Sequence, residues 1–371
     1  MSQEKRIINV GVIGTGCISQ NHLMSLILLS ANARTIWKRK VKLVLKALCD
    51  IDEAKMKMMA SHFPAEKLYT NPYDLINDPE IHAVFVLVPT CDHKELTIAA
   101  CKAKKHVFVE KPLAFSDEDI AEMIKARDEN HVVVQPGLVF RSAPQIIYMK
   151  KFMQQNSERF GKITNIIFRD SQEKPYTGLD SHGSTWRADY KKAHAGILFE
   201  HTIHDIDGLI YMLGEIEDVY FKVKYYAGKE QIEDSVAGVV GFKNGVSLTV
   251  NSMWNDIKFS ARRYEIYFEK AYVIITVDEK AGKSVSIRYK YLDEQETELE
   301  EETMLKYFLE SIGFPHVKNE LTGPYYFEDL RFINAIFENK PAYPTLEHGR
   351  YVQKIIEKAY ESSRKNERIN I

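Results

Sequence analysis

The sequence predicts an α/β fold in which a doubly wound parallel sheet is followed by an α+β domain with a large, mostly antiparallel open sheet. Up to residue 135, short continuous apolar runs alternate with amphipathic helical patterns, as in a parallel sheet that helices cover on both faces. After residue 136, apolar residues recur at every second position, as in strands with one buried face. A chain of 371 residues is long enough for two hydrophobic cores, so we expect two domains, residues 1–135 and 136–371.

The first region alternates apolar runs with helical patterns. Strands are predicted at residues 8–14, 43–50, 83–89, 106–110 and 132–135, and helices at residues 17–31, 53–62, 93–103 and 117–130. The last of these helices has a local start signal, because Ser116 can cap its N-terminus and acidic residues follow in the first turn.

The second region is dominated by strands with period-two patterns. Strands are predicted at residues 163–170, 217–226, 235–242, 246–254, 262–269, 271–278 and 284–291, with Asn244-Gly245 as a hairpin turn. Helices are predicted at residues 143–156 and 196–213, and two more near the end of the chain. These few helices leave one face of a broad sheet uncovered, so we expect a homo-oligomer, a dimer or a tetramer, built through that face.

The composition limits the classes of partner. A formal net charge of −2 lacks the basic surplus of a nucleic-acid binder. No run approaches the roughly 20 apolar residues that cross a bilayer, and the start of the chain lacks a signal-peptide pattern. The four cysteines, Cys17, Cys49, Cys91 and Cys101, are widely spaced and form no CxxC pair, so we expect reduced, buried thiols of a cytosolic protein. We therefore expect a soluble cytoplasmic protein without nucleic-acid or membrane partners.

A glycine-rich stretch, GVIGTGCIS at residues 11–19, follows the first predicted strand and opens the first helix. Gly14, Gly16 and Ser19 fit the G-x-G-x-x-G/A pattern of a dinucleotide-binding Rossmann domain. Gly14 allows the tight turn, Gly16 lets the backbone approach a pyrophosphate, and the small Ser19 permits close packing of the helix on the sheet. Cys17 and Ile18, in the first turn of the helix, complete the predicted phosphate-binding segment.

The second predicted strand ends in Asp50, where a carboxylate accepts hydrogen bonds from the adenosine ribose and repels a 2′-phosphate. The sequence therefore favours NAD, and NADP less. The interval from Gly16 to Asp50 is longer than the roughly 20 residues usual for this pattern, and the basic segment 33–40 looks like inserted material. This segment leaves two interpretations open, a solvated loop or a phosphate site formed by Arg34, Lys38, Arg39 or Lys40.

The fifth predicted strand runs into Glu110-Lys111-Pro112. Ligands of open parallel sheets bind beyond the carboxyl ends of the strands, so we expect Lys111 to project into the cofactor crevice. A surface lysine before a proline is the alternative interpretation.

These stretches together resemble the Gfo/Idh/MocA family, the glucose-fructose oxidoreductase and inositol dehydrogenase group. The similarity extends over nearly all of the chain. It is carried by GVIGTGCIS, Asp50, VPTCDH (88–93), EKP (110–112), GLVFRSAP (137–144), STWRADY (184–190), AGILFEHTIHDIDGLIYMLG (195–214) and the closing segment FINAIFENKPAYPTLEHGRYVQKIIEKAYESS.

The resemblance implies an NAD-dependent dehydrogenase that acts on a CH–OH group of a sugar, cyclitol or sugar derivative, with Lys111, Glu200 and His204 as its catalytic trio. The acid is Glu200 where the family usually has an aspartate, and Thr90 stands where an asparagine is common. Further implied contacts to the cofactor come from Pro89, Thr90, His93, Glu110, Lys111 and Gln135. Candidates for the substrate pocket, each with a structural role as its alternative, are Arg141, Trp186, Arg187, Asp189 and His201.

The stretch FEHTIHD, residues 199–205, allows several chemistries. Its spacing excludes a zincin, which needs two histidines four residues apart, whereas His201 and His204 are three apart. We expect no metal, with a mononuclear ion on Glu200, His201 and His204 as the alternative. The helix could also only present polar residues to water. On a regular helix, however, Glu200 and His204 lie one turn apart at the half-buried border of an apolar stripe, where pKa values shift.

The chemistry of alcohol oxidation assigns roles to these residues. His204 would remove the hydroxyl proton as hydride leaves the same carbon for nicotinamide, and Lys111 would stabilise the developing alkoxide. Two other functions fit the same fold. One is NAD-dependent, redox-neutral glycoside cleavage, and the other is a nucleotide-binding sensor that has no catalytic activity.

Overall fold

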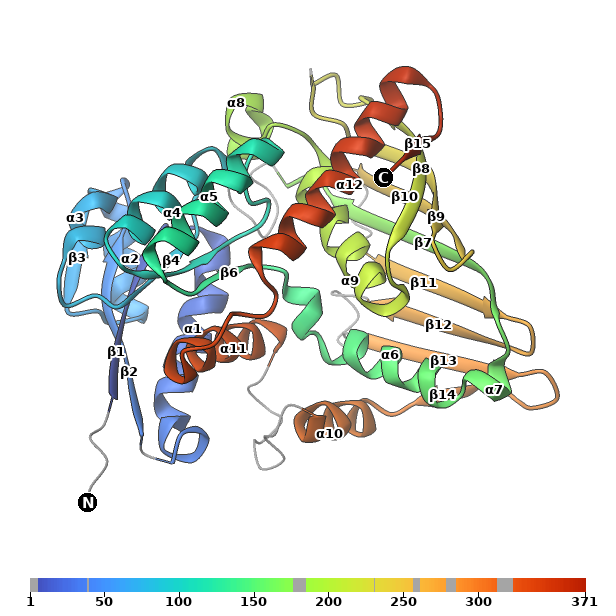
Figure 1. Ribbon diagram of the computed structural model, residues 1–371, viewed down its shortest axis with the longest axis horizontal. Helices are drawn as coiled ribbons and strands as arrows, with labels where there is room; N and C mark the ends of the chain where they lie inside the picture. The colour runs from blue at the N-terminus through green and yellow to red at the C-terminus, as the bar shows by residue number, and fades with distance from the viewer. Residues whose placement is uncertain are drawn as a thin grey trace. The chain divides into compact units, whose positions relative to one another are not determined.

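The protein is described from a computed structural model, which covers residues 6–38, 40–175, 185–229, 231–255, 261–277, 285–311 and 323–371. The chain divides into two compact units (Figure 1). The first consists of Met1–Ser142 with Lys318–Tyr351, and the second of Ala143–Val317 with Val352–Ile371. The division expected at residue 135 therefore differs in two respects: the first unit extends to Ser142, and a later part of the chain, up to Tyr351, returns to it.

The first unit contains a six-stranded sheet in the order β3-β2-β1-β4-β5-β6, and all its strand pairs are parallel. Its strands are β1 (Arg6–Ile13), β2 (Val41–Cys49), β3 (Lys67–Tyr69), β4 (Ala83–Val86), β5 (His106–Val109) and β6 (Val134–Pro136). Its helices are α1 (Cys17–Ile36), α2 (Glu53–His62), α3 (Pro72–Asn77), α4 (His93–Lys102), α5 (Asp117–Asn130) and α11 (Pro324–Glu338), with 3₁₀ turns η1 (Thr90–Asp92) and η2 (Val139–Ser142). The predicted doubly wound parallel sheet is confirmed.

Helix α11 belongs to this unit because it packs beside α1. The Trp37 indole donates a hydrogen bond to Asn334 at 2.6 Å, and His22 contacts Asp329 at 2.9 Å. The partners lie about 300 residues apart along the chain, so no local pattern could indicate this return.

The basic segment at residues 33–40 is not a loop insertion near the phosphates. Arg34 lies in the last turn of α1, and Lys38 and Lys40 follow before β2 begins. At 1.5 Å per residue, Arg34 is about 25 Å along the helix from the glycine-rich turn, so the alternative phosphate site is wrong for these residues. Arg39 lies outside the described residues.

The second unit contains a nine-stranded sheet, counted over the described part of the chain, in the order β14-β13-β12-β11-β7-β10-β9-β8-β15. Its strands are β7 (Ile163–Glu173), β8 (Ile216–Lys224), β9 (Ser235–Phe242), β10 (Ser247–Asn255), β11 (Ala261–Phe268), β12 (Ala271–Val277), β13 (Val285–Tyr291), β14 (Thr297–Leu299) and β15 (Ile369–Asn370). Its helices are α6 (Pro144–Gln155), α7 (Ser157–Phe160), α8 (Tyr190–Ala193), α9 (Ile203–Leu213), α10 (Glu301–Ser311) and the later part of α12 (Leu346–Lys365), with a 3₁₀ turn η3 (Trp186–Ala188) and a π-helical turn η4 (Leu198–Thr202). Only β7 and β10 pair in parallel, so the mostly antiparallel sheet is confirmed.

One face of this second sheet is exposed. Along β7, β9 and β10, buried residues alternate with exposed or half-buried ones, as predicted. The register places Val239, Thr249 and Ile167 side by side on three neighbouring strands, and Tyr220 continues the row on β8. Ile167 is 38% exposed and Val239 is 47% exposed. This face thus presents an apolar row across the middle of the sheet.

Among the described residues, no helix combines the length and the apolar character that a membrane crossing requires.

The two glycines of the first turn have different environments. Gly14 has a φ of +95°, and a Cβ there would lie 2.3 Å from the backbone oxygen of Leu87. Gly16 has a φ of −71°, and a Cβ there would meet nothing within 4 Å. Gly14 is therefore required by the fold, whereas Gly16 faces open space.

We expect Gly14→Ala to lower the free energy of unfolding by at least about 2 kcal/mol. The energetic cost of the left-handed conformation adds to that of the clash between the new Cβ and the backbone. Gly16→Ala is the matched control and should change it by less than about 0.5 kcal/mol. Urea denaturation followed by circular dichroism measures both. Equal stability of the two variants would contradict this account of the turn.

Candidate active site

The turn between β1 and α1 forms an open N-terminus of a long helix. Gly16 is the N-cap of α1, no side chain caps this end, and the Ser19 hydroxyl donates a hydrogen bond to the Gly16 oxygen at 2.6 Å. Cys17, the first residue of α1, is exposed, and Ile18 follows it half-buried. A helix N-terminus with its macrodipole and without a side-chain cap fits the binding of a phosphate group.

Asp50 lies against this turn. Its Oδ2 atom accepts hydrogen bonds from the backbone N–H and the hydroxyl of Thr15, both at 2.7 Å. Its Oδ1 atom accepts the backbone N–H of Asp52 at 2.9 Å. The structure therefore brings Asp50 beside the glycine-rich turn, where the sequence predicted an acid for the ribose.

The loop after β4 is tied to the turn after β5 by His93. Its imidazole is buried, with Nδ1 at 2.7 Å from the oxygen of Pro112 and Nε2 at 2.9 Å from the oxygen of Val88. His93 thus holds two loops together, and its ring is not directed to a ligand. Pro89 precedes the 3₁₀ turn in which Thr90 is buried.

Lys111 is the second residue after β5, which ends at Val109, so it lies at the carboxyl end of this strand as predicted. The preceding Glu110 is 6% exposed, and its Oε2 atom accepts the backbone N–H of Lys111 at 2.9 Å. Gln135 in β6 is fully buried, and its amide donates to the backbone oxygen of Glu328 at 2.9 Å. The Gln135 side chain therefore serves packing within this unit. Lys111 lies at the carboxyl edge of the sheet that also carries the glycine-rich turn and Asp50.

The segment with Glu200 and His204 departs from the predicted single helix over residues 196–213. A π-helical turn, Leu198–Thr202, contains Glu200 and His201, and the α-helix α9 begins only at Ile203. The expectation of 100° per residue is therefore wrong up to Thr202. Glu200 is 1% exposed, which is more buried than the border position predicted for it, whereas His204 is half-buried as predicted.

Arg187 reaches Glu200 from the 3₁₀ turn η3. Its Nε atom donates to Glu200 Oε2 at 3.0 Å, so the buried carboxylate has a cationic partner. The Arg187 guanidinium also lies 4.3 Å from the centre of the Trp186 ring, a cation–π contact. Arg187 is thus in contact with two other predicted site residues, Glu200 and Trp186.

The other predicted substrate residues have structural partners. Asp189 accepts the backbone N–H of Lys191 at 3.0 Å and caps the short helix α8. His201 Nδ1 accepts the Trp254 indole N–H at 2.9 Å. Arg141 belongs to the first unit, is 4% exposed and donates to Tyr343 at 3.3 Å.

A metal held by Glu200, His201 and His204 has no support in the geometry. Within the described ranges, the only three His, Cys, Asp or Glu side chains whose ligand atoms lie within 4.8 Å of one another are His22, Glu110 and Glu328. Glu200 instead contacts Arg187, and His201 contacts Trp254.

Glu233 is a site residue that the sequence patterns did not indicate. Its carboxylate, fully buried, accepts the backbone N–H groups of Gly196 at 2.8 Å and Leu198 at 2.9 Å. Its backbone oxygen accepts the N–H of Ile197 at 3.0 Å. A Cβ on Gly196 would lie 1.8 Å from that same oxygen, so only glycine fits there. Burial raises the pKa of Glu233 to about 7, although these donors and Tyr360 oppose the shift.

The start of α9 has a second anchor on the sheet. Asp205 is fully buried, with its Oδ1 atom 3.3 Å from Arg262 Nε and bonded to the hydroxyl of Tyr264, both on β11. Burial raises the pKa of Asp205 to about 7, and Arg262 opposes the shift. Glu233 and Asp205 thus fix the segment on both sides of Glu200 and His204.

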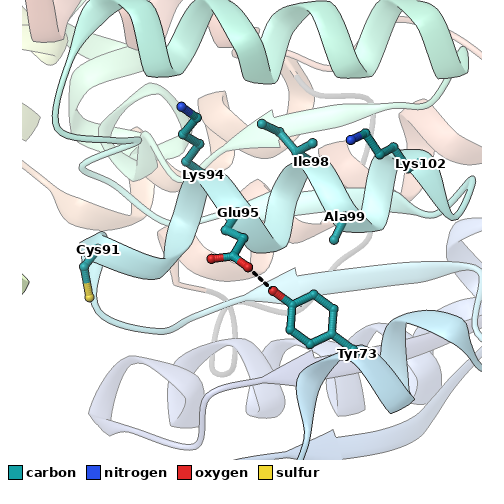
Figure 2. A pocket seen from close by; sticks show the side chains of 7 residues that line it. All are labelled: Tyr73, Cys91, Lys94, Glu95, Ile98, Ala99 and Lys102. Carbon is teal, nitrogen blue, oxygen red and sulfur yellow. Dashed lines mark hydrogen bonds between the residues drawn. The ribbon is translucent and has the colours of Figure 1, made fainter.

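A separate hollow of about 520 Å³ lies along α4 in the first unit (Figure 2). Figure 2 shows the Tyr73 hydroxyl bonded to Glu95 across it, with Lys94 and Lys102 on the same helix. None of the predicted site residues lines it.

Two family models match this chain. The model described as the oxidoreductase family with an NAD-binding Rossmann fold matches residues 8–138, and that of the GFO/IDH/MocA C-terminal domain matches residues 148–274. The prediction of an NAD-dependent oxidoreductase is thereby confirmed at the level of the family.

Relatives and solved structures agree with these models. The chain is 27% identical over 319 residues to myo-inositol 2-dehydrogenase of Thermotoga maritima, covering 82% of this chain and 88% of that protein. It is 26% identical over 238 residues to levoglucosan dehydrogenase of Pseudarthrobacter phenanthrenivorans, covering 64% and 59%. The fold superposes on a levoglucosan dehydrogenase complex with NADH and levoglucosan with a TM-score of 0.82, at 22% identity over 99% of this chain and 100% of the other. With both domain models matched in order along one chain, the protein belongs to the Gfo/Idh/MocA oxidoreductase family.

Proposed function

We propose that this protein is an NAD-dependent dehydrogenase that moves hydride between a secondary alcohol of a sugar, cyclitol or sugar derivative and nicotinamide. The observation that carries the proposal is the retention, in a chain of this family, of Lys111 at the carboxyl end of β5 and of His204 beside a buried acid. Relatives named inositol 2-dehydrogenase and levoglucosan dehydrogenase support a polyhydroxylated substrate.

The cofactor site in this proposal consists of Gly16, the N-terminus of α1, and Asp50. The bound dinucleotide supplies the hydride acceptor. Gly16 leaves room for a pyrophosphate because a Cβ there would meet nothing within 4 Å, and the helix end favours its negative charge. The Asp50 carboxylate would accept hydrogen bonds from the ribose hydroxyls and would repel a 2′-phosphate.

The catalytic roles follow from the charges of the side chains. The Lys111 ammonium would stabilise the negative charge that develops on the substrate oxygen. The half-buried His204 would take the hydroxyl proton as general base, since an imidazole titrates near neutrality. Glu200 is held by Arg187 and would accept a hydrogen bond from a neighbouring substrate hydroxyl.

We expect Lys111→Met and His204→Asn to lower kcat by about 100-fold to 10,000-fold, as is typical for the loss of a proton-transfer or charge-stabilising group. Affinity for NAD should change by less than about 3-fold, because in this proposal both side chains act on the substrate, while Gly16, the N-terminus of α1 and Asp50 hold the dinucleotide. Lys125→Met, on the exposed face of α5, is the matched control. Absorbance of the reduced cofactor, with a panel of inositols and sugars, measures turnover.

The outcomes of this assay separate the candidate functions. Full activity of either variant would contradict the assigned roles. Release of an aglycone from a nitrophenyl glycoside without net cofactor reduction would replace the proposal by glycoside cleavage. NAD binding without turnover of any polyol or glycoside would indicate a sensor.

We expect Asp50→Asn to raise the ratio of kcat/KM for NADP over NAD by at least about 10-fold, because the variant removes the charge that repels the 2′-phosphate. The amide keeps an oxygen that accepts from Thr15, so the turn should persist. Steady-state kinetics with both cofactors test this. A wild-type protein that prefers NADP would contradict the role of Asp50.

We also infer that the exposed face of the second sheet binds a second copy of the chain. The row of Tyr220, Val239, Thr249 and Ile167 offers a mostly apolar, exposed surface at which two copies would meet through the same face, as in isologous interfaces. A cytosolic location fits four cysteines without a disulfide. The expectation that all four are buried is wrong, because only Cys49 and Cys101 are buried, whereas Cys17 and Cys91 are exposed.

Light scattering after gel filtration should give a mass that is a multiple of 42.9 kDa. We expect Ile167→Glu with Val239→Glu to shift this mass to that of a monomer, because two charges at the centre of the face cannot be buried unpaired. Leu292→Glu, exposed outside the row, is the control. A wild-type protein that is monomeric at micromolar concentration would refute the interface.

A further inference from the structure

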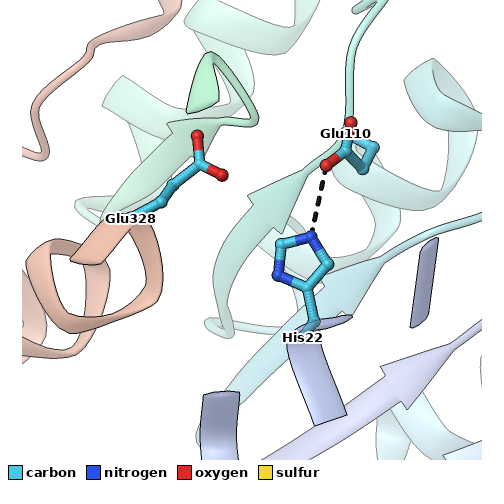
Figure 3. Close-up of side chains that lie close together, drawn as sticks. All are labelled: His22, Glu110 and Glu328. Carbon is cyan, nitrogen blue, oxygen red and sulfur yellow. Dashed lines mark hydrogen bonds and ion pairs between the residues drawn. The ribbon is translucent and has the colours of Figure 1, made fainter. Parts of the chain in front are cut away.

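Four ionisable side chains from three distant segments meet inside the first unit. His22 lies on α1, Glu110 follows β5, and Glu328 and Asp329 lie on α11. His22, Glu328 and Asp329 are 0% exposed and Glu110 is 6% exposed. Figure 3 shows His22, Glu110 and Glu328 facing one another. Buried charge at this density has to be compensated locally.

His22 bridges two of the acids. Its Nδ1 atom lies 2.9 Å from Asp329 Oδ1, and its Nε2 atom lies 3.2 Å from Glu110 Oε1. An imidazole that donates to two carboxylates has to carry both ring protons, which makes it a cation. Burial opposes this charge, but Asp329 and Glu110 raise the pKa of His22 to about 10. The side chain is therefore an internal counter-ion for both carboxylates.

Glu110 connects this cation to Lys111. While Oε1 faces His22, Oε2 accepts the backbone N–H of Lys111 at 2.9 Å. On the other side, a Cβ on Gly137 would lie 2.8 Å from Glu110 Oε1, so the backbone closes against the carboxylate. Burial opposes ionisation of Glu110, but His22 and Lys111 lower its pKa. The Glu110 anion is thus in electrostatic contact with Lys111.

The remaining groups around His22 add little negative charge. Burial and Glu110 raise the pKa of Glu328 well above its usual range, which favours the neutral form of this acid. The charge of Arg331 on α11 opposes this rise in the pKa of Glu328. The Tyr325 ring lies 5.4 Å from the His22 ring. Phe85 and Phe108 cover the imidazole from the sheet.

We propose that His22, held by Asp329, is a positioning residue for Lys111: it keeps Glu110 ionised inside the first unit, and ionised Glu110 fixes the Lys111 turn and stabilises its ammonium group. The inference rests on the role of Lys111 in the proposed function. In this proposal, α1 and α11 contribute no catalytic group, but they carry the buried charges that position Lys111.

A divalent cation on His22, Glu110 and Glu328 is the competing occupant, since their ligand atoms lie within 4.8 Å of one another. A metal ion would need the Nε2 lone pair of His22. Both ring nitrogens instead lie within hydrogen-bonding distance of carboxylates, 2.9 Å from Asp329 and 3.2 Å from Glu110, and these acids raise the pKa of His22, which favours the imidazolium.

The test is an NMR titration of Lys111 after reductive ¹³C-methylation, with the resonance assigned by Lys111→Arg. In His22→Gln, Glu110 loses its counter-ion and takes up a proton, and Lys111 then loses a nearby negative charge. The midpoint of Lys111 should fall by about 1 pH unit or more. Glu110→Gln keeps the shape of the side chain and should lower the Lys111 midpoint by the same amount. This variant replaces His22→Gln in the test if His22→Gln does not fold. The alkaline limb of the kcat profile should shift in the same direction.

His106→Gln is the matched control, because His106 begins the same strand and accepts a hydrogen bond from Val133 N–H at 3.0 Å. Its Lys111 midpoint should equal that of the wild type. An unchanged Lys111 midpoint in folded His22→Gln or Glu110→Gln would overturn the proposal. Metal analysis would also overturn it if the wild type contained one equivalent of bound metal and Glu328→Gln contained none. A wild type inert toward polyols would refute the proposed function alone, since the titration needs no turnover.

Discussion

The buried carboxylate of Glu233 determines where the segment with Glu200 and His204 begins. A carboxylate without access to water needs several donors, and Glu233 obtains them from the N–H groups of Gly196 and Leu198 and from Tyr360. Because these N–H groups belong to the start of a helical segment, satisfying the acid also caps the helix. Any shift of the segment along its axis would leave the charge uncompensated, which makes its position a deep energy minimum.

In the first unit, buried acids are also compensated locally, and there a buried cation takes part in the compensation. There the acids are Glu110 and Asp329, and an imidazolium from α1 compensates both. In each unit, a half-buried side chain assigned to chemistry, Lys111 or His204, belongs to a segment that a fully or nearly fully buried ionisable side chain holds in place. The return of α11 to α1 supplies part of this compensation, because without Asp329 the fully buried His22 would have one counter-ion fewer.

The sequence predicted what depends on local periodicity. The α2 and α5 helices begin and end where the patterns placed them, and Lys111 follows its strand as expected. Short elements such as β3 were missed because three residues carry no period. Partners far apart in sequence were missed as well: His22 and Asp329 are 307 positions apart, and Glu233 lies 37 positions from Gly196. Hydrophobic patterns specify which face is buried, and they do not specify which polar group satisfies a buried charge.

The π-helical turn is the feature of the candidate site that local sequence patterns did not predict. In a regular α-helix, Glu200 and His204 would lie on one face with similar burial. The structure gives them different environments, with Glu200 1% exposed against Arg187 and His204 half-buried at the start of α9. A π turn adds one residue per hydrogen-bonded loop and changes the direction of the side chains that precede the α-helix. The turn therefore gives two residues four positions apart different environments, with the Glu200 carboxylate paired with Arg187 and the His204 imidazole half-buried.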